Sequence, residues 1–121
     1  MTTDSIFQKQ WKSLIEQLSK DFPLRSPSST DSILYLIGLQ ELGKPHQVFS
    51  REDKINLIHI GTCKVLEPYG YYFFQERDQE GWPHFRRAKD YLSLEGKQQE
   101  QLLKEAILHY FKEIEYFHNE E

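Results

Sequence analysis

Positions 33–43 read I-L-Y-L-I-G-L-Q-E-L-G, an apolar run that closes on a glycine. A helix that is apolar on nearly every side is buried in a protein core, so the run predicts a central helix from about Ser29 to Leu42. Glycine adopts the left-handed conformation that ends many helices, and Gly43 therefore marks the C-terminal stop. Other segments must pack around this helix on several sides, which makes it the element from which the fold is built.

A second helix is indicated by positions 50–68, which read S-R-E-D-K-I-N-L-I-H-I-G-T-C-K-V-L-E-P. Ser50 followed by Asp53 is a start signal, and the helix should run to about Glu67, ahead of a proline. Gly61 lies near its middle, as Gly38 does in the first helix, and each glycine costs about 1 kcal/mol relative to alanine. We therefore predict that the two helices cross with their backbones in contact at these glycines.

Two amphipathic segments complete a mainly α domain of about four principal helices that spans residues 1–121. One runs from about Asp4 to Asp21 and the other from about Ser93 to Phe117, and each repeats apolar residues at steps of three and four. The apolar stripes consist of Phe7, Trp11, Leu14, Leu18 and Phe22 in the first segment and of Leu103, Ile107, Tyr110, Ile114 and Phe117 in the last. Positions 118–121 are predicted to form a solvated tail.

The segment ahead of the last helix is rich in rings. Positions 69–85 read Y-G-Y-Y-F-F-Q-E-R-D-Q-E-G-W-P-H-F and contain seven of the chain's seventeen aromatic residues. Alternation replaces the helical period here, which predicts a small β-hairpin near residues 71–86 with a turn over Asp78–Gly81. Pro83 would keep its strand at a sheet edge, because proline cannot donate to a ladder. The alternative is an irregular aromatic loop that follows an extended preceding helix.

These rings carry the leading interpretation of function. On a strand, Tyr72 and Phe74 face one side while Tyr71 and Phe73 face the other, so all four are buried only when both faces are covered. Exposed aromatic side chains are typical of protein interfaces, so we interpret the chain as a non-enzymatic protein-interaction domain that self-associates as a homodimer or binds another protein. The residues assigned to this interface or to a ligand are Tyr71, Tyr72, Phe74, Trp82, His84, Phe85 and Arg86. A second candidate face, on the last helix, carries Tyr110, Phe111, Tyr116 and Phe117.

The mixture of basic and aromatic residues in segment 71–89 supports an alternative function. Rings beside arginines hold phosphate-bearing ligands or single-stranded nucleic acid. Nucleic acid is argued against by the formal net charge of −4 and by acidic residues interleaved in the same segment. The second interpretation is therefore a binder of a small ligand or of a phosphate-bearing ligand. The residues that would hold such a ligand are Tyr72, Trp82, His84 and Arg86.

Candidate reactive groups are few, and the sequence contains no glycine-rich phosphate loop or hydrolase motif. His59 and Cys63 lie four residues apart on a predicted helix and form a weak candidate metal pair, but a full site needs two more ligands. Cys63 is a poor candidate nucleophile, because a helix interior does not stabilise a thiolate. Glu105, His109 and Glu113 are more typical of a salt-bridged ridge than of an acid–base site. We expect no catalytic residue, metal or cofactor, and an unrecognised enzyme that uses His59 or His84 is the third interpretation.

Length and composition favour a single domain. The 121 residues are 38% hydrophobic and 28% charged, and a chain of this size buries roughly two thirds of its unfolded surface in one core. The single cysteine fits a reducing compartment. The first residues do not form a basic and apolar leader, and the longest apolar run, 33–39, is far shorter than the roughly 20 residues of a spanning helix. We expect a cytoplasmic protein without a membrane partner.

Three runs of the sequence resemble those of a family of small uncharacterised bacterial proteins. The runs are 33–43, 54–72 and 77–85, the last of which reads R-D-Q-E-G-W-P-H-F. The resemblance covers about positions 30–117. It implies a stand-alone cytoplasmic bacterial domain, and it assigns no activity and no functional residue.

Overall fold

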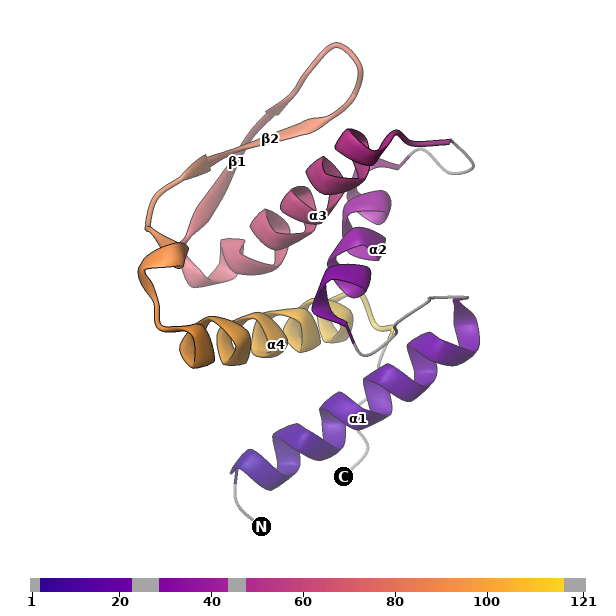
Figure 1. Ribbon diagram of the computed structural model, residues 1–121, viewed down its shortest axis with the longest axis vertical. Helices are drawn as coiled ribbons and strands as arrows, with labels where there is room; N and C mark the ends of the chain where they lie inside the picture. Colours follow the sequence, from indigo (N-terminus) through magenta and orange to yellow (C-terminus); the bar gives the residue numbers. More distant parts are fainter. Residues whose placement is uncertain (1–2, 23–28, 44–47, 117–121) are drawn as a thin grey trace.

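The computed structural model describes residues 3–22, 29–43 and 48–116, and it has the predicted mainly α architecture with one small β-hairpin (Figure 1). The elements are α1 (Thr3–Asp21), α2 (Thr30–Leu42), α3 (Arg51–Leu66), the 3₁₀ helix η1 (Glu67–Tyr69), β1 (Tyr72–Arg77), β2 (Pro83–Arg87), the 3₁₀ helix η2 (Tyr91–Ser93) and α4 (Gly96–Glu113). The hairpin is therefore confirmed over the irregular loop. Phe117 and the predicted tail at 118–121 lie outside the described residues.

The crossing of α2 and α3 has the predicted glycine contact. A Cβ atom added at Gly38 would overlap the backbone carbonyl of Leu57, and one added at Gly61 would overlap the backbone carbonyl of Leu34. The contact is reciprocal, because each helix presses its own glycine against the backbone of the other. Only glycine allows two helix backbones to approach so closely, so both residues are explained by packing rather than by flexibility.

Local signals set the ends of these helices. The Ser50 side chain accepts a hydrogen bond from the backbone N–H of Asp53 at 3.1 Å, which caps α3 as predicted. Gly43 has a φ of 71° and ends α2 in the left-handed conformation. The predicted start of α4, near Ser93 or Leu94, is too early by about one half-turn. Glu95 and Gln98 form a reciprocal capping box instead, so the helix begins at Gly96.

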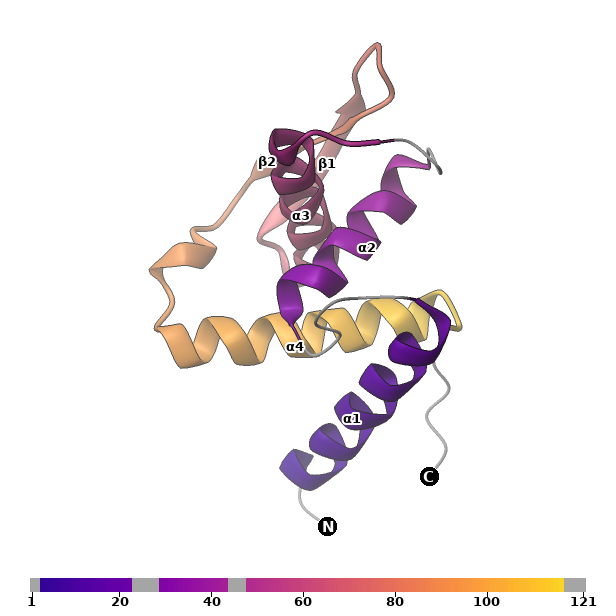
Figure 2. The same ribbon diagram turned by 45° about the vertical axis from the view of Figure 1, so that its right-hand side comes forward.

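The elements stack so that α3 and α4 are each covered on two sides. In both ribbon views, α3 lies between α2 and the hairpin, while α4 crosses below them and separates them from α1 (Figures 1 and 2). Fully buried leucines and isoleucines join α1, α2, α3 and α4 in one core. A smaller core lies between α2, α3 and the hairpin and contains Leu42, Phe49, Leu57 and Ile60. Among the described residues, no helix is long and apolar enough to cross a bilayer.

Two predicted stripe residues lie at the edge of the core rather than inside it. Ile114 is 47% exposed, because α4 ends at Glu113 and the chain turns at Glu115, which has a φ of 59°. Phe22, which directly follows α1, is 37% exposed and its ring contacts the ring of Tyr116. Both errors have one cause, since a stripe extended past the last turn of a helix no longer faces the same neighbour.

The hairpin pairs β1 with β2 in antiparallel register and contains one bulge. Phe73 is opposite Arg86 and Phe74 is opposite Phe85, and a register shift follows at Gln75. Gly81 completes the predicted turn with a φ of 90°. The sheet of the described residues consists of β1 and β2 alone, so both strands are edge strands and Pro83 is tolerated at the start of β2.

Candidate functional site

The hairpin has an inner face that packs on the helices and an outer face that meets solvent. Tyr72 and Pro83 are buried, and Phe85 is half-buried against both cores. Strand residues alternate in direction, so the neighbours of these residues point away from the helices. Phe73, His84 and Arg86 are accordingly exposed.

Two phenylalanines of β1 remain in contact with solvent. Phe73 is 42% exposed and Phe74 is 48% exposed. The guanidinium carbon of Arg86 lies 5.4 Å from the centre of the Phe73 ring, which is a cation–π distance. Phe74 meets Phe85 edge to face with 5.8 Å between ring centres. Phe73 and Arg86 are opposite each other on the outer face, and we call this pair the outer aromatic patch; Phe74 and Phe85 pair on the inner face, where Phe74 is only partly covered.

The other predicted site rings fasten the hairpin to the helical body. Trp82 is half-buried and contacts Phe49 edge to face at 6.3 Å. Tyr71 is half-buried against Tyr91 at 6.3 Å, and the ammonium of Lys89 lies 5.1 Å from the centre of the Tyr71 ring. These contacts bury apolar ring surface and hold a two-stranded ribbon that would be marginal alone.

The structure therefore divides the seven predicted residues into three groups. It places His84 and Arg86 on the outer face, and it places Tyr72, Phe74 and Phe85 on the inner face, while Tyr71 and Trp82 contact the helical body. Phe73 is the residue missing from the predicted set. Its position directly across from Arg86 is a consequence of strand register.

Asp78 organises the turn of the hairpin. Its carboxylate accepts backbone N–H bonds from Glu80 at 3.0 Å and from Trp82 at 2.9 Å, and it contacts Nε2 of His84 at 2.9 Å. The hydrogen bond from His84, followed by the one from Trp82, lowers the pKa of Asp78 below its ordinary value. Arg77 binds the carbonyl oxygens of Gly81 at 2.8 Å and of Glu41 at 2.6 Å, which links the turn to the end of α2.

Glu67 joins the base of the hairpin to α3. Its Oε2 accepts a hydrogen bond from the backbone N–H of Phe74 at 3.0 Å, and its Oε1 lies 3.9 Å from the ammonium of Lys64. Unpaired N–H groups of an edge strand are templates for another strand. The Glu67 carboxylate therefore occupies one such group on β1.

The predicted pair of His59 and Cys63 is in contact on α3. Nε2 of His59 lies 3.5 Å from Sγ of Cys63, and the His59 ring meets Tyr72 edge to face at 6.0 Å. Burial raises the pKa of the Cys63 thiol to about 12, so the thiol stays protonated at neutral pH. In the part of the chain that the structure describes, no three His, Cys, Asp or Glu side chains are grouped to hold a metal ion.

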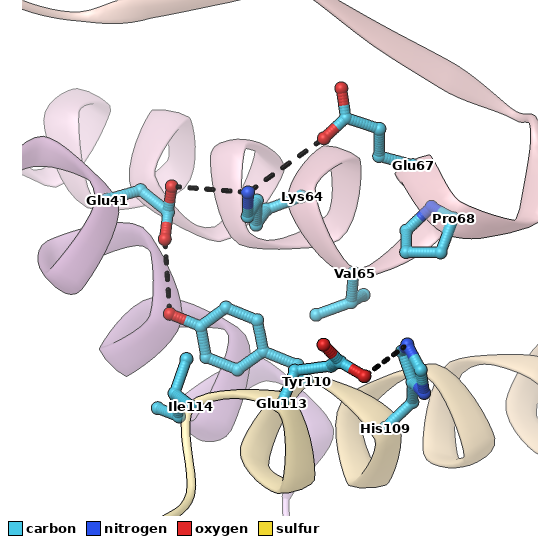
Figure 3. A pocket seen from close by; sticks show the side chains of 9 residues that line it. All are labelled: Glu41, Lys64, Val65, Glu67, Pro68, His109, Tyr110, Glu113 and Ile114. Atoms are coloured by element: carbon cyan, nitrogen blue, oxygen red, sulfur yellow. Dashed lines mark hydrogen bonds and ion pairs between the residues drawn. The ribbon is translucent and has the colours of Figure 1, made fainter.

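His109 and Glu113 of α4 line a cavity that the sequence did not predict. The imidazole of His109 contacts the carboxylate of Glu113 at 3.8 Å, whereas Glu105 is bonded to Gln101 at 2.9 Å. The cavity has a volume of about 490 Å³ and lies where α2, α3 and α4 end (Figure 3). It is lined by Glu41, Lys64, Val65, Glu67, Pro68, His109, Tyr110, Glu113 and Ile114.

Polar contacts join three of the side chains that line this cavity. Lys64 lies 3.9 Å from Glu41, and the Tyr110 hydroxyl donates a hydrogen bond to the other oxygen of Glu41 at 3.2 Å (Figure 3). Burial and the nearby Glu41 carboxylate raise the pKa of Tyr110, so its hydroxyl remains a neutral donor. These residues come from three helices, so no local sequence pattern could have grouped them.

No protein-family model, curated protein or solved structure matches this chain. The resemblance to small bacterial proteins therefore stays a prediction.

Proposed function

We propose that this chain is a non-enzymatic interaction domain that self-associates through the outer aromatic patch of its hairpin. The exposure of Phe73 on the outer face of a projecting two-stranded ribbon is the observation that carries the proposal. Large rings beside an arginine are the side chains that contribute most to protein interfaces. The inner rings already stabilise the fold, so Phe73 on the outer face is available to a partner.

Charge along the hairpin favours a second copy of the chain as the partner. The base carries Arg87 and Lys89, whereas the turn end carries Glu76, Asp78 and Glu80. Arg77 at the turn end and Asp90 at the base reduce this separation of charge but do not reverse it. Two hairpins related by a two-fold axis and laid in opposite directions would place each basic base beside an acidic turn. The outer aromatic patch lies between the two charged ends and would occupy the centre of that contact.

Strand edges are less suited than the face to this association. Glu67 already accepts the N–H of Phe74 on β1, and Pro83 lacks an N–H on β2. Both features oppose the addition of a strand from another chain. Side-chain contact across the outer face is therefore the mode that we propose.

Sedimentation velocity over a range of protein concentrations tests the proposal. We expect a dimer of the wild-type chain that weakens as salt increases, because opposite charges meet across the contact. Phe73→Ser should weaken the dimer by about tenfold or more, as expected for a central aromatic residue. Ile6→Ser is the matched control, since Ile6 is 37% exposed and lies on α1, away from the hairpin. A monomeric wild type, or equal weakening by both variants, would exclude the proposal.

The small-ligand alternative is less well supported at the hairpin. It requires Tyr72 and His84 to face one ligand, but Tyr72 is buried on the inner face and His84 is exposed on the outer face. A thermal-shift screen of the Phe73→Ser variant would separate the two functions, because a ligand bound by the inner rings would not depend on Phe73. We also propose a cytoplasmic location, which fits a buried, unpaired cysteine.

A further inference from the structure

The cavity at the ends of α2, α3 and α4 has an unequal balance of charge. Three carboxylates, from Glu41, Glu67 and Glu113, face one ammonium, that of Lys64. These four groups carry a formal excess of two negative charges. Its volume of about 490 Å³ lies within the range of small-molecule sites. The cavity therefore favours a cationic occupant of small-molecule size.

The ammonium of Lys64 leaves the carboxylate oxygens that line the cavity able to accept further hydrogen bonds. Lys64 Nζ is 3.9 Å from the nearest oxygens of both Glu41 and Glu67, which is longer than an N–H···O hydrogen bond. The Glu113 side chain is 70% exposed, and its contact with His109 is also long, at 3.8 Å. A ligand with well-placed N–H donors could make shorter, charge-assisted hydrogen bonds to these oxygens.

The spacing of the carboxylates favours an extended organic cation over a metal ion. Among the described residues, no group of three possible ligands is close enough to hold one ion. Val65, Pro68 and Ile114 supply apolar surface between the polar groups. A ligand with a short hydrocarbon chain and separated amino groups would match both features, because its ammonium ends reach different carboxylates while its methylenes contact the apolar residues.

We propose that this cavity binds a small aliphatic amine of the diamine or polyamine class, with Glu41 and Glu113 as the principal acceptors of its ammonium groups. Tyr110 positions Glu41, because the Tyr110 hydroxyl donates to one carboxylate oxygen and leaves the other directed to the Lys64 side of the cavity (Figure 3). Lys64 competes with the ligand at Glu41, since its ammonium lies 3.9 Å from that carboxylate. This site is separate from the outer aromatic patch and does not depend on self-association.

Isothermal titration calorimetry with 1,4-diaminobutane at constant ionic strength tests the site. We expect binding of one diamine per chain, and we expect none for 1,4-butanediol, which has the same length without charge. Glu113→Gln should weaken diamine binding by about tenfold or more, as the loss of a charge-assisted hydrogen bond predicts. Lys64→Gln should strengthen it, because the competing ammonium is removed.

Two surface variants control for net charge. Glu16→Gln and Lys12→Gln make the same charge changes at exposed positions of α1, and both should bind the diamine as the wild type does. The proposal is overturned if the wild type does not bind the diamine, if the diol binds equally well, or if the cavity and control variants behave alike. Circular dichroism of each variant shows whether a loss of binding comes from a loss of fold.

Discussion

Gly38 lies directly against the backbone carbonyl of Leu57, so the crossing of α2 and α3 leaves no space for a side chain at position 38. Gly38→Ala should destabilise the protein by about 1–3 kcal/mol, because overpacking at a rigid backbone exceeds the gain in helix propensity. Urea denaturation measures this change. Gly96→Ala is the control, because no atom lies within 4 Å of the added Cβ at position 96, and we expect its free energy of unfolding to stay within about 1 kcal/mol of the wild type. Equal stability of the two variants would contradict the proposed packing role of Gly38.

The fold was predictable to the extent that local patterns determine it. The crossing of α2 and α3 was predicted from the helix periods, the Ser50 cap and the two glycines. Each of these signals depends on residues close in sequence or on one residue type. The aromatic segment predicted the hairpin, but the choice of exposed rings depended on which face the helices cover. That is why Phe73 was missed.

The cavity could not be predicted for a different reason. Glu41 and Glu113 come from α2 and α4, and only the packing of those helices brings them to one cavity. Sequence spacing showed Glu113 beside His109 as a surface ridge, which is true of α4 taken alone. A site assembled from three helix ends leaves no periodic signal in any one of them.

Removing the Glu67 carboxylate should reduce the protection of one backbone amide of β1. In Glu67→Ala, the backbone N–H of Phe74 loses its acceptor, so we expect its hydrogen exchange to accelerate by about tenfold. NMR-detected exchange measures this amide directly. Glu16→Ala, at an exposed site on α1, should leave the Phe74 amide unchanged. An unaltered exchange rate in Glu67→Ala would show that the hydrogen bond does not protect the strand edge.

The Asp78 turn should depend on pH in the acid range. The pKa of Asp78 is lowered in the folded chain, mainly by the hydrogen bond with His84, so its carboxylate stabilises the fold above its ordinary pKa of 3.8. This contribution is lost as the pH falls through the lower, folded-state pKa. We expect Asp78→Asn to have a lower Tm than the wild type at pH 6, and the difference should shrink as the pH falls below about 3.8. A difference that is constant with pH would contradict the role of the charge.

Burial of Cys63 should make the protein sensitive to alkali. The folded-state pKa of the thiol is raised from 9.0 to about 12, so the unfolded chain loses this proton before the folded chain does. A group of this kind stabilises the fold fully below pH 9 and loses that contribution as the pH rises toward 12. The loss is at most about 1.4 kcal/mol per pH unit.

The free energy of unfolding of Cys63→Ala isolates this effect from the tyrosines. Burial also raises the pKa of Tyr91 to about 12, but Tyr91 is present in both proteins and its contribution cancels in their difference. We expect the wild type to be the more stable protein at pH 8, because alanine leaves a small void beside His59. That advantage should shrink steadily between pH 9 and pH 11. A constant advantage would mean that the thiol ionises as easily in the folded chain as in the unfolded one, and the buried environment of Cys63 would then have to be rejected.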